Sequence, residues 1–119
     1  MSENKRVVEK YIDGFNKSDH KQILSCLTDD VEWEMPGFFH LHGKDAFDKE
    51  IENPAFSGKP VVKILRLFEE GDVVVVEGSV KSRKSTGEDF YAMFCDIFDM
   101  KKGKIKKLTG YLHEIKKST

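Results

Sequence analysis

The second half of the chain constrains the fold most, because from Pro60 onward it consists of long segments with the alternation of β-strands. Short polar breaks, each with a glycine, separate these segments, and such breaks are typical of tight turns. The predicted strands are Val61–Glu69, Val73–Lys81, Glu88–Met100 and Lys104–Ile115. We therefore expect a meander of four antiparallel strands.

The first half has a helical pattern instead. Apolar residues at helical spacing from Val7 to Phe15 predict an amphipathic first helix, in which Gly14 suggests a close approach of backbone or ligand. Asp19 followed by Gln22 resembles a capping box and predicts a short second helix. A third helix is expected from Lys44 to Glu52, where Asn53-Pro54 breaks it.

A short strand is expected between the second and third helices. Val31–Met35 has strand character and stops at Pro36-Gly37, and Phe38–His42 is predicted to be an aromatic loop. Helices first and a long antiparallel sheet afterwards predict an α+β fold. The length of 119 residues fits one domain, residues 1–119, without a linker.

Composition excludes several classes of function. The formal net charge of -1 argues against a nucleic-acid surface, and no apolar run is long enough for a membrane span. No phosphate-binding, nucleotide or nucleophile motif is present, so we expect function without a cofactor. Cys26 and Cys95 have no paired spacing and no signal peptide is evident, so we expect a cytoplasmic protein with free thiols.

The segment Phe90–Met100 is apolar on both faces. Its even-numbered residues put Asp96 among aromatic side chains, and its odd-numbered residues are also mainly apolar. One face must pack on the helices. The other is expected to be buried as well, because the solvent-exposed face of an antiparallel sheet is normally polar. We expect its cover to be a second copy of the chain, in a homodimer through the outer sheet face.

Several short motifs in this order resemble the nuclear transport factor 2-like superfamily, which includes ketosteroid isomerases and SnoaL-type polyketide cyclases. The motifs are Val7-Val8-Glu9-Lys10-Tyr11 with Asn16 and Asp19, Asp29-Asp30-Val31-Glu32-Trp33, Gly43-Lys44-Asp45-Ala46, Cys95-Asp96-Ile97-Phe98 and Gly103-Lys104-Ile105. The resemblance covers residues 5–115 and implies a cone-like curved antiparallel sheet packed on three N-terminal helices around an apolar pocket.

The resemblance also implies roles for two residues. Ketosteroid isomerases form an oxyanion hole from a tyrosine and a protonated aspartic acid, which is a worked example of pKa tuning. Tyr11 and Asp96 occupy the matching positions. The residue before Pro36, where those enzymes have their aspartate base, is Met35, whose thioether cannot take a proton from carbon.

The residues around Asp96 support an unusual acid independently of the resemblance. Asp96 lies between Phe94 and Phe98 on one strand face, so burial is expected to raise its pKa and favour the neutral, hydrogen-bond-donating form. Tyr11 would offer a second donor to the same point. The alternative is that a backbone amide or Tyr11 satisfies Asp96, which then only shapes the core.

Histidines supply the remaining candidate chemistry. His40 is the best candidate for a general base, because imidazole titrates near neutral pH and Glu32 and Glu34 should face outward if Trp33 faces inward. His40 and His42 form an H-x-H pair that could ligate a metal with Glu34 or Asp45 as third ligand. Two surface imidazoles are the favoured interpretation, and we expect no metal.

Two functions remain open. The first is an enzyme or binding protein for a small apolar carbonyl or phenolic compound, which it would bind and, if catalytic, isomerise or cyclise, with Asp96, Tyr11 and His40 as catalytic candidates. The second is a non-catalytic dimeric module with a vestigial pocket. The predicted lining residues are Phe15, Trp33, Met35, Phe38, Phe39, Phe47, Phe94 and Leu112.

Overall fold

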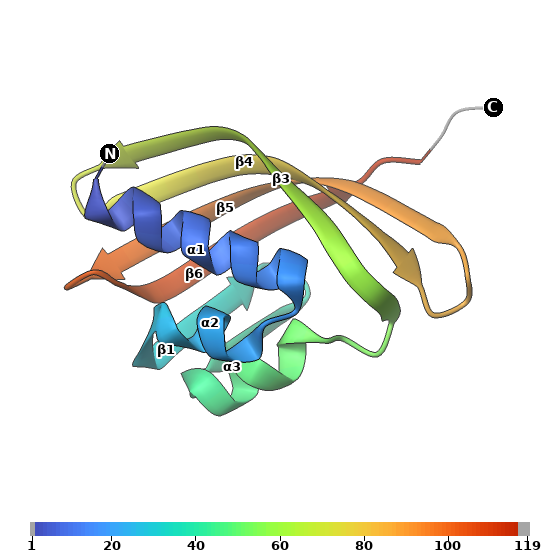
Figure 1. The fold of residues 1–119 in the computed structure, drawn as a ribbon, viewed down its shortest axis with the longest axis horizontal. Coiled ribbons are helices and arrows are strands. Elements are labelled where there is room, and N and C mark those ends of the chain that lie inside the picture. The colour runs from blue at the N-terminus through green and yellow to red at the C-terminus, as the bar shows by residue number, and fades with distance from the viewer. Residues whose placement is uncertain (1, 117–119) are drawn as a thin grey trace.

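Three helices and six strands make up the computed structural model, which describes residues 2–116 (Figure 1). The helices are α1 (Glu3–Lys17), α2 (His20–Ser25) and α3 (Gly43–Ile51). The strands are β1 (Leu27–Met35), β2 (Phe39–His42), β3 (Phe56–Glu70), β4 (Val73–Lys84), β5 (Asp89–Lys101) and β6 (Lys104–Glu114). No helix within residues 2–116 is long and apolar enough to cross a membrane.

All six strands form one sheet in the order β2-β1-β6-β5-β4-β3. The meander from β3 to β6 is antiparallel, as predicted, while β1 joins β6 in parallel and β2 pairs antiparallel with β1. The sheet curves, with α1 running across one face and α2 and α3 lying near β1 (Figure 1). The predicted α+β class with a curved sheet on three helices is confirmed.

The prediction of a loop at Phe38–His42 was wrong. Phe39–His42 is a strand, because Pro36-Gly37 forms a tight turn rather than an end to the pairing. The Phe38 amide donates to the Met35 carbonyl at 2.8 Å, and Gly37 has a φ of +87° that favours glycine. A four-residue strand has too few alternating positions for its period to be recognised in the sequence.

Two strands also begin earlier than predicted. β1 starts at Leu27 rather than Val31, with an irregularity before Glu32 that lets the Asp29-Asp30 pair remain within the strand. β3 starts at Phe56, and its register with β4 shifts between Ser57 and Val61. Irregular register of this kind allows polar residues and glycine inside a strand.

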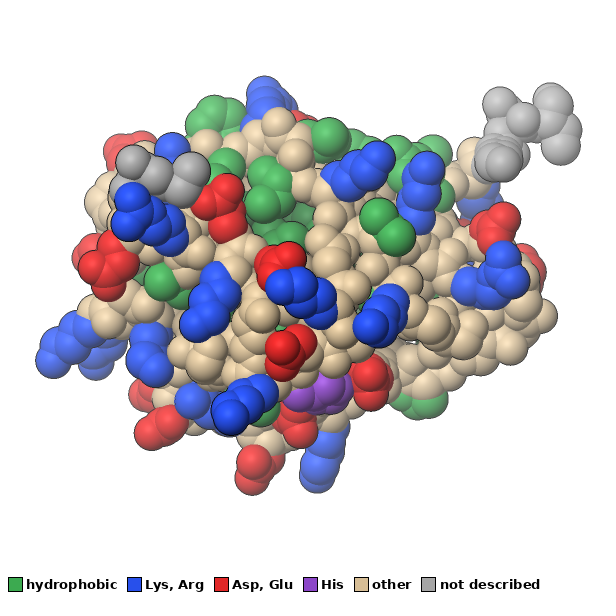
Figure 2. All heavy atoms as spheres, in the orientation of Figure 1, with side chains coloured by type: hydrophobic (Ala, Val, Ile, Leu, Met, Phe, Trp, Pro, Cys, Tyr) green, Lys and Arg blue, Asp and Glu red, His purple; other side chains and the backbone are tan. Residues whose placement is uncertain are grey.

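The core lies between α1 and the inner face of the sheet. The buried side chains of α1 are Val8, Tyr11 and Ile12, one helical stripe, as its spacing predicted. On the sheet the fully buried residues include Val74, Val76, Phe98, Ile105 and Leu108. Charged side chains of both signs are interspersed over the helical face (Figure 2).

Two glycines allow unusually close packing. A Cβ on Gly14 would lie 2.6 Å from Cγ1 of Ile23, so the close approach expected at Gly14 is the contact between α1 and α2. A Cβ on Gly78 would lie 2.5 Å from Cζ of Phe94, which shows that the Phe94 ring covers the neighbouring strand at its registered partner.

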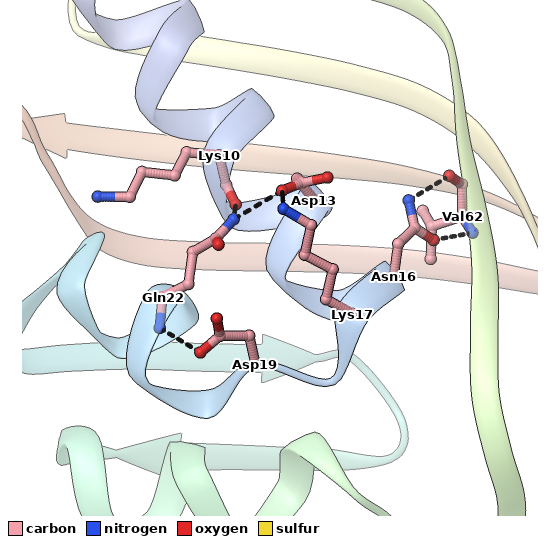
Figure 3. A network of polar contacts seen from close by, with 7 residues as sticks. All are labelled: Lys10, Asp13, Asn16, Lys17, Asp19, Gln22 and Val62. Carbon is pink, nitrogen blue, oxygen red and sulfur yellow. Dashed lines mark hydrogen bonds and ion pairs between the residues drawn. The ribbon is translucent and has the colours of Figure 1, made fainter.

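Asn16, at the end of α1, fixes the helix to the edge strand β3 (Figure 3). Its side-chain amide donates to the Val62 carbonyl at 3.0 Å and its carbonyl accepts from the Val62 amide at 2.6 Å. The side chain therefore occupies backbone groups that an edge strand otherwise leaves open. Gln22 joins α2 to α1 through Asp13 and the Lys10 carbonyl in the same network.

Replacement of Asn16 by alanine tests this attachment. We expect Asn16→Ala to lower the free energy of unfolding by about 1–3 kcal/mol, because it leaves two part-buried backbone groups of Val62 unpaired. Urea unfolding measures the loss, with the exposed neighbour Lys17→Ala as control. Equal stability of the two variants would contradict a structural role for the Asn16 pair.

Candidate active site

Asp96 lies on the inner face of the sheet, at the middle of β5. Its registered neighbours are Val76 on β4 and Gly110 on β6. Phe98, on the same face, is fully buried, and Phe94 is 9% exposed. The strand alternation predicted this face correctly, so Asp96 projects toward the apolar interior.

The absence of a side chain at Gly110 makes room for the acid. A Cβ built there would lie 2.9 Å from Oδ1 of Asp96 and 3.6 Å from Cγ of Met35. The Met35 side chain and the Asp96 carboxyl group therefore both border the space over Gly110, and Met35 stands where the resemblance implies a base in ketosteroid isomerases. The sequence reasoning missed Gly110, although a glycine inside a strand often marks such a close approach.

Burial raises the pKa of Asp96 to about 7, from an ordinary value of 3.8. Within residues 2–116 the Asp96 carboxyl makes no hydrogen bond or ion pair to another side chain, so nothing offsets its desolvation. The residue nevertheless keeps a small accessible surface. Asp96 is therefore desolvated without being completely enclosed.

Tyr11 approaches the same region from α1. It is 3% exposed, and burial, followed by the negative charge of Asp96, raises the pKa of its phenol well above 10.0. Its ring packs edge-to-face on Phe15, Phe47 and Phe98 at centroid distances of 5.1, 6.1 and 5.4 Å. Tyr11 and Asp96 thus interact through charge, and no hydrogen bond joins these two residues.

The remaining predicted lining residues lie at different depths. Phe47 is fully buried and stacks on Trp33 at 4.4 Å, while Trp33 meets Phe39 at 5.3 Å. Phe15, Trp33 and Leu112 are partly buried against the core, and Met35 is also partly buried. These rings pack on one another, so the aromatic residues fill much of the space in which the sequence suggested a cavity.

Phe38 differs from the expectation. Its side chain is 74% exposed because it sits at the turn between β1 and β2, outside the core. Two shallow surface hollows of about 340 and 350 Å³ also lie elsewhere, at the N-terminus of α1 and at the far end of β3 and β4. Neither is lined by Asp96 or Tyr11, so the hollows are separate from the acid.

His40 does not face Asp96. Trp33 and Phe39 point inward and touch, so alternation places His40 and Glu32 on the opposite, outer face of the β1–β2 hairpin. His40 is 43% exposed there, with Nε2 at 3.5 Å from Oε1 of Glu32. His40, the base candidate of the sequence, therefore lies on the face opposite Asp96.

Comparison with known proteins identifies the family of this chain. Residues 8–108 match the SnoaL-like domain. The chain belongs to the SnoaL-like domain family. The family has the nuclear transport factor 2-like fold that the sequence motifs resemble, and the match covers all the strands of the sheet in whole or in part. A comparison with curated proteins finds no significant match.

Solved structures agree on the fold. A LEH-like epoxide hydrolase of M. tuberculosis is 22% identical, with a TM-score of 0.82 over 93% of this chain and 83% of that one. A nuclear transport factor 2-like protein of unknown function from Burkholderia pseudomallei K96243 is 21% identical, with a TM-score of 0.85 and coverages of 95% and 92%. TerC, co-crystallised with polyporic acid, is 24% identical, with a TM-score of 0.83 and coverages of 92% and 90%.

The pH dependence of stability tests the pKa of Asp96. Because the folded pKa of about 7 exceeds the ordinary 3.8, the unfolded chain loses this proton first, and the contribution of Asp96 to stability is lost as the pH rises through 7. We expect the free energy of unfolding of the wild type, relative to Asp96→Asn, to fall between these pH values by at most about 1.4 kcal/mol per pH unit. Urea titrations at several pH values measure it, and a constant difference would contradict the raised pKa.

Proposed function

We propose that the inner face of the sheet binds a small planar apolar molecule through a carbonyl or phenolic oxygen. Asp96 in its protonated form donates one hydrogen bond to that oxygen, and the Tyr11 phenol donates another. The observation that carries this proposal is an unpartnered carboxyl group in an apolar interior, with a pKa of about 7. A neutral acid in such a site is a strong donor toward a developing oxyanion.

The surroundings favour an aromatic or alicyclic ligand over a charged one. Phe15, Trp33 and Leu112 lie at the edge of the core, where partly buried apolar side chains can open around a flat molecule. Structural likeness to TerC, which was co-crystallised with polyporic acid, supports a ligand in this fold.

Catalysis on this site is limited by Met35. A thioether is no proton acceptor, and His40 faces away, so neither of these two residues in the described part of the chain supplies a base beside Asp96. We therefore propose binding with hydrogen-bond donation as the basic function. Isomerisation or cyclisation would follow only for a substrate whose reaction needs no protein base, with Asp96 as the proton donor.

Binding of simple phenols tests the proposal directly, because a phenolic oxygen mimics an enolate. Asp96→Leu, which keeps the number of heavy atoms, and Tyr11→Phe each remove one donor, and we expect each to weaken binding by about 1–3 kcal/mol. Two substitutions on the outer face are matched controls. Asp99→Asn changes a residue of the same strand as Asp96, and Tyr111→Phe changes a tyrosine. Calorimetry or thermal shift measures the affinities.

The same assay has a pH signature. Wild-type affinity should fall above pH 7 as Asp96 ionises, whereas Asp96→Asn, which keeps a donor that does not titrate, should bind independently of pH below the pKa of the phenol. Failure of every phenol to bind, or equal losses in the control variants, would overturn the proposed site.

The outer face supports a second function, that of a dimeric interaction module. Leu65, Phe68 and Tyr111 are 52%, 52% and 51% exposed, which is unusual for large apolar side chains on one sheet face. We propose that a second copy of the chain covers this face, as the two-sided apolar pattern of β5 led us to expect. A module of this kind would need no ligand on Asp96.

Sedimentation of the wild type and of Tyr111→Lys tests the dimer. We expect a dimeric mass at micromolar concentration for the wild type and a shift toward monomer for the variant, because a charge would be buried in an apolar interface. Tyr91→Phe keeps the apolar ring and serves as control. A monomeric wild type would contradict the dimer and leave the ligand proposal unaffected.

The free thiols of Cys26 and Cys95 are compatible with the proposed cytoplasmic location.

A further inference from the structure

Two imidazoles and one carboxylate meet on the outer face of the β1–β2 hairpin. His40 and His42 alternate along β2 and so project from the same side, with ring centroids 4.6 Å apart. Glu32 is the registered partner of His42 on β1. One ligand atom from each of these three side chains lies within 4.8 Å of the others.

The separations fit a shared metal ion better than a hydrogen-bonded cluster. Oε1 of Glu32 is 3.3 Å from Nδ1 of His42 and 3.5 Å from Nε2 of His40. Two metal–ligand bonds of about 2.0–2.1 Å at a tetrahedral angle would put their ligand atoms about 3.3–3.4 Å apart. Normal N–H···O hydrogen bonds are shorter, at about 2.7–3.2 Å.

His20 provides the contrast within the same chain. Its Nδ1 lies 2.5 Å from Oδ1 of Asp48, a direct hydrogen bond that raises the pKa of the imidazole. Glu32 makes no such bond to either ring, and it sits between them instead. The other ring nitrogen of His20, Nε2, lies 3.3 Å from Oε2 of Glu52, so one imidazole there joins two carboxylates, whereas at Glu32 one carboxylate lies between two imidazoles.

The neighbouring charges leave Glu32 available. Lys107 on β6 is the registered partner of Glu32, yet its Nζ lies 3.6 Å from Oε1 of Glu34. Glu34 thus forms the ion pair with Lys107, and the Glu32 carboxylate remains directed at the histidines. The sequence suggested Glu34 or Asp45 as a third ligand. Strand register places Glu34 opposite His40 as well as Glu32 opposite His42, and the side-chain distances point to Glu32 instead.

We propose that Glu32, His40 and His42 bind a divalent transition-metal ion of the zinc, nickel and copper class. Imidazole nitrogens with one carboxylate suit these ions and disfavour magnesium and calcium, which prefer oxygen ligands. The ion would link the edge strand β2 to β1, and its remaining position would take water or a donor from another molecule. The site is on the face opposite Asp96, so it is independent of the proposed ligand site.

Calorimetric titration of untagged protein at pH 7.5 with ZnCl₂ and NiCl₂ tests the site. We expect a single ion per chain, and a loss of affinity of about tenfold or more in each of His40→Ala, His42→Ala and Glu32→Gln. Glu34→Gln and His113→Ala are matched controls, a neighbouring carboxylate and another exposed histidine, and should stay within about twofold of wild type. MgCl₂ should give no binding.

Thermal unfolding with and without the metal supplies an independent readout. The ion should raise the unfolding temperature of the wild type and of both controls, and should not raise that of the three ligand variants, because an ion that binds only the folded state stabilises it. The variants change exposed side chains, so their metal-free unfolding temperatures verify folding. Equal losses in Glu34→Gln or His113→Ala, or no saturable binding by the wild type, would overturn the proposal.

Discussion

The packing of α1 across the inner face of the sheet is the contact on which the rest of the structure depends. Val8, Tyr11 and Ile12 form one buried stripe, and the Tyr11 ring meets three other aromatic rings edge-to-face. Asn16 holds the end of the helix to β3 through two backbone hydrogen bonds. Because the helix is fixed at both its apolar stripe and its end, it shields this part of the inner face from water, and Tyr11 and Asp96 are desolvated there.

That shielding explains the chemistry of Asp96. A carboxylate in such a place loses hydration without gaining a partner, so the neutral acid becomes the favoured form near pH 7. Gly110 provides the space for it, and Met35 borders the same space. An acid retained under these conditions costs stability, which is typical of residues kept for function. The outer face has the opposite character, with exposed apolar side chains and a cluster of possible metal ligands.

The sequence was sufficient for the α+β class, the meander and the inward position of Asp96, because long strands and helices have clear periods. It was insufficient wherever the answer depended on pairing between strands. The four residues of β2 are too few to show alternation. Register sets both Glu32 and Glu34 opposite a histidine, and only the side-chain positions, with Glu34 paired to Lys107, distinguish Glu32. The contact of Gly110 with Asp96 likewise joins neighbouring strands, although its place inside a strand was a usable signal.

The central claim is that Asp96, on the inner face, titrates near neutral pH rather than near its ordinary value. A titration of the Asp96 side-chain carboxyl by carbon-13 NMR, assigned with Asp96→Asn, measures this directly. The structure predicts a midpoint near 7. A midpoint near the ordinary value of 3.8 would show that the carboxyl is hydrated or paired, and would contradict both the raised pKa and the donor role proposed for it.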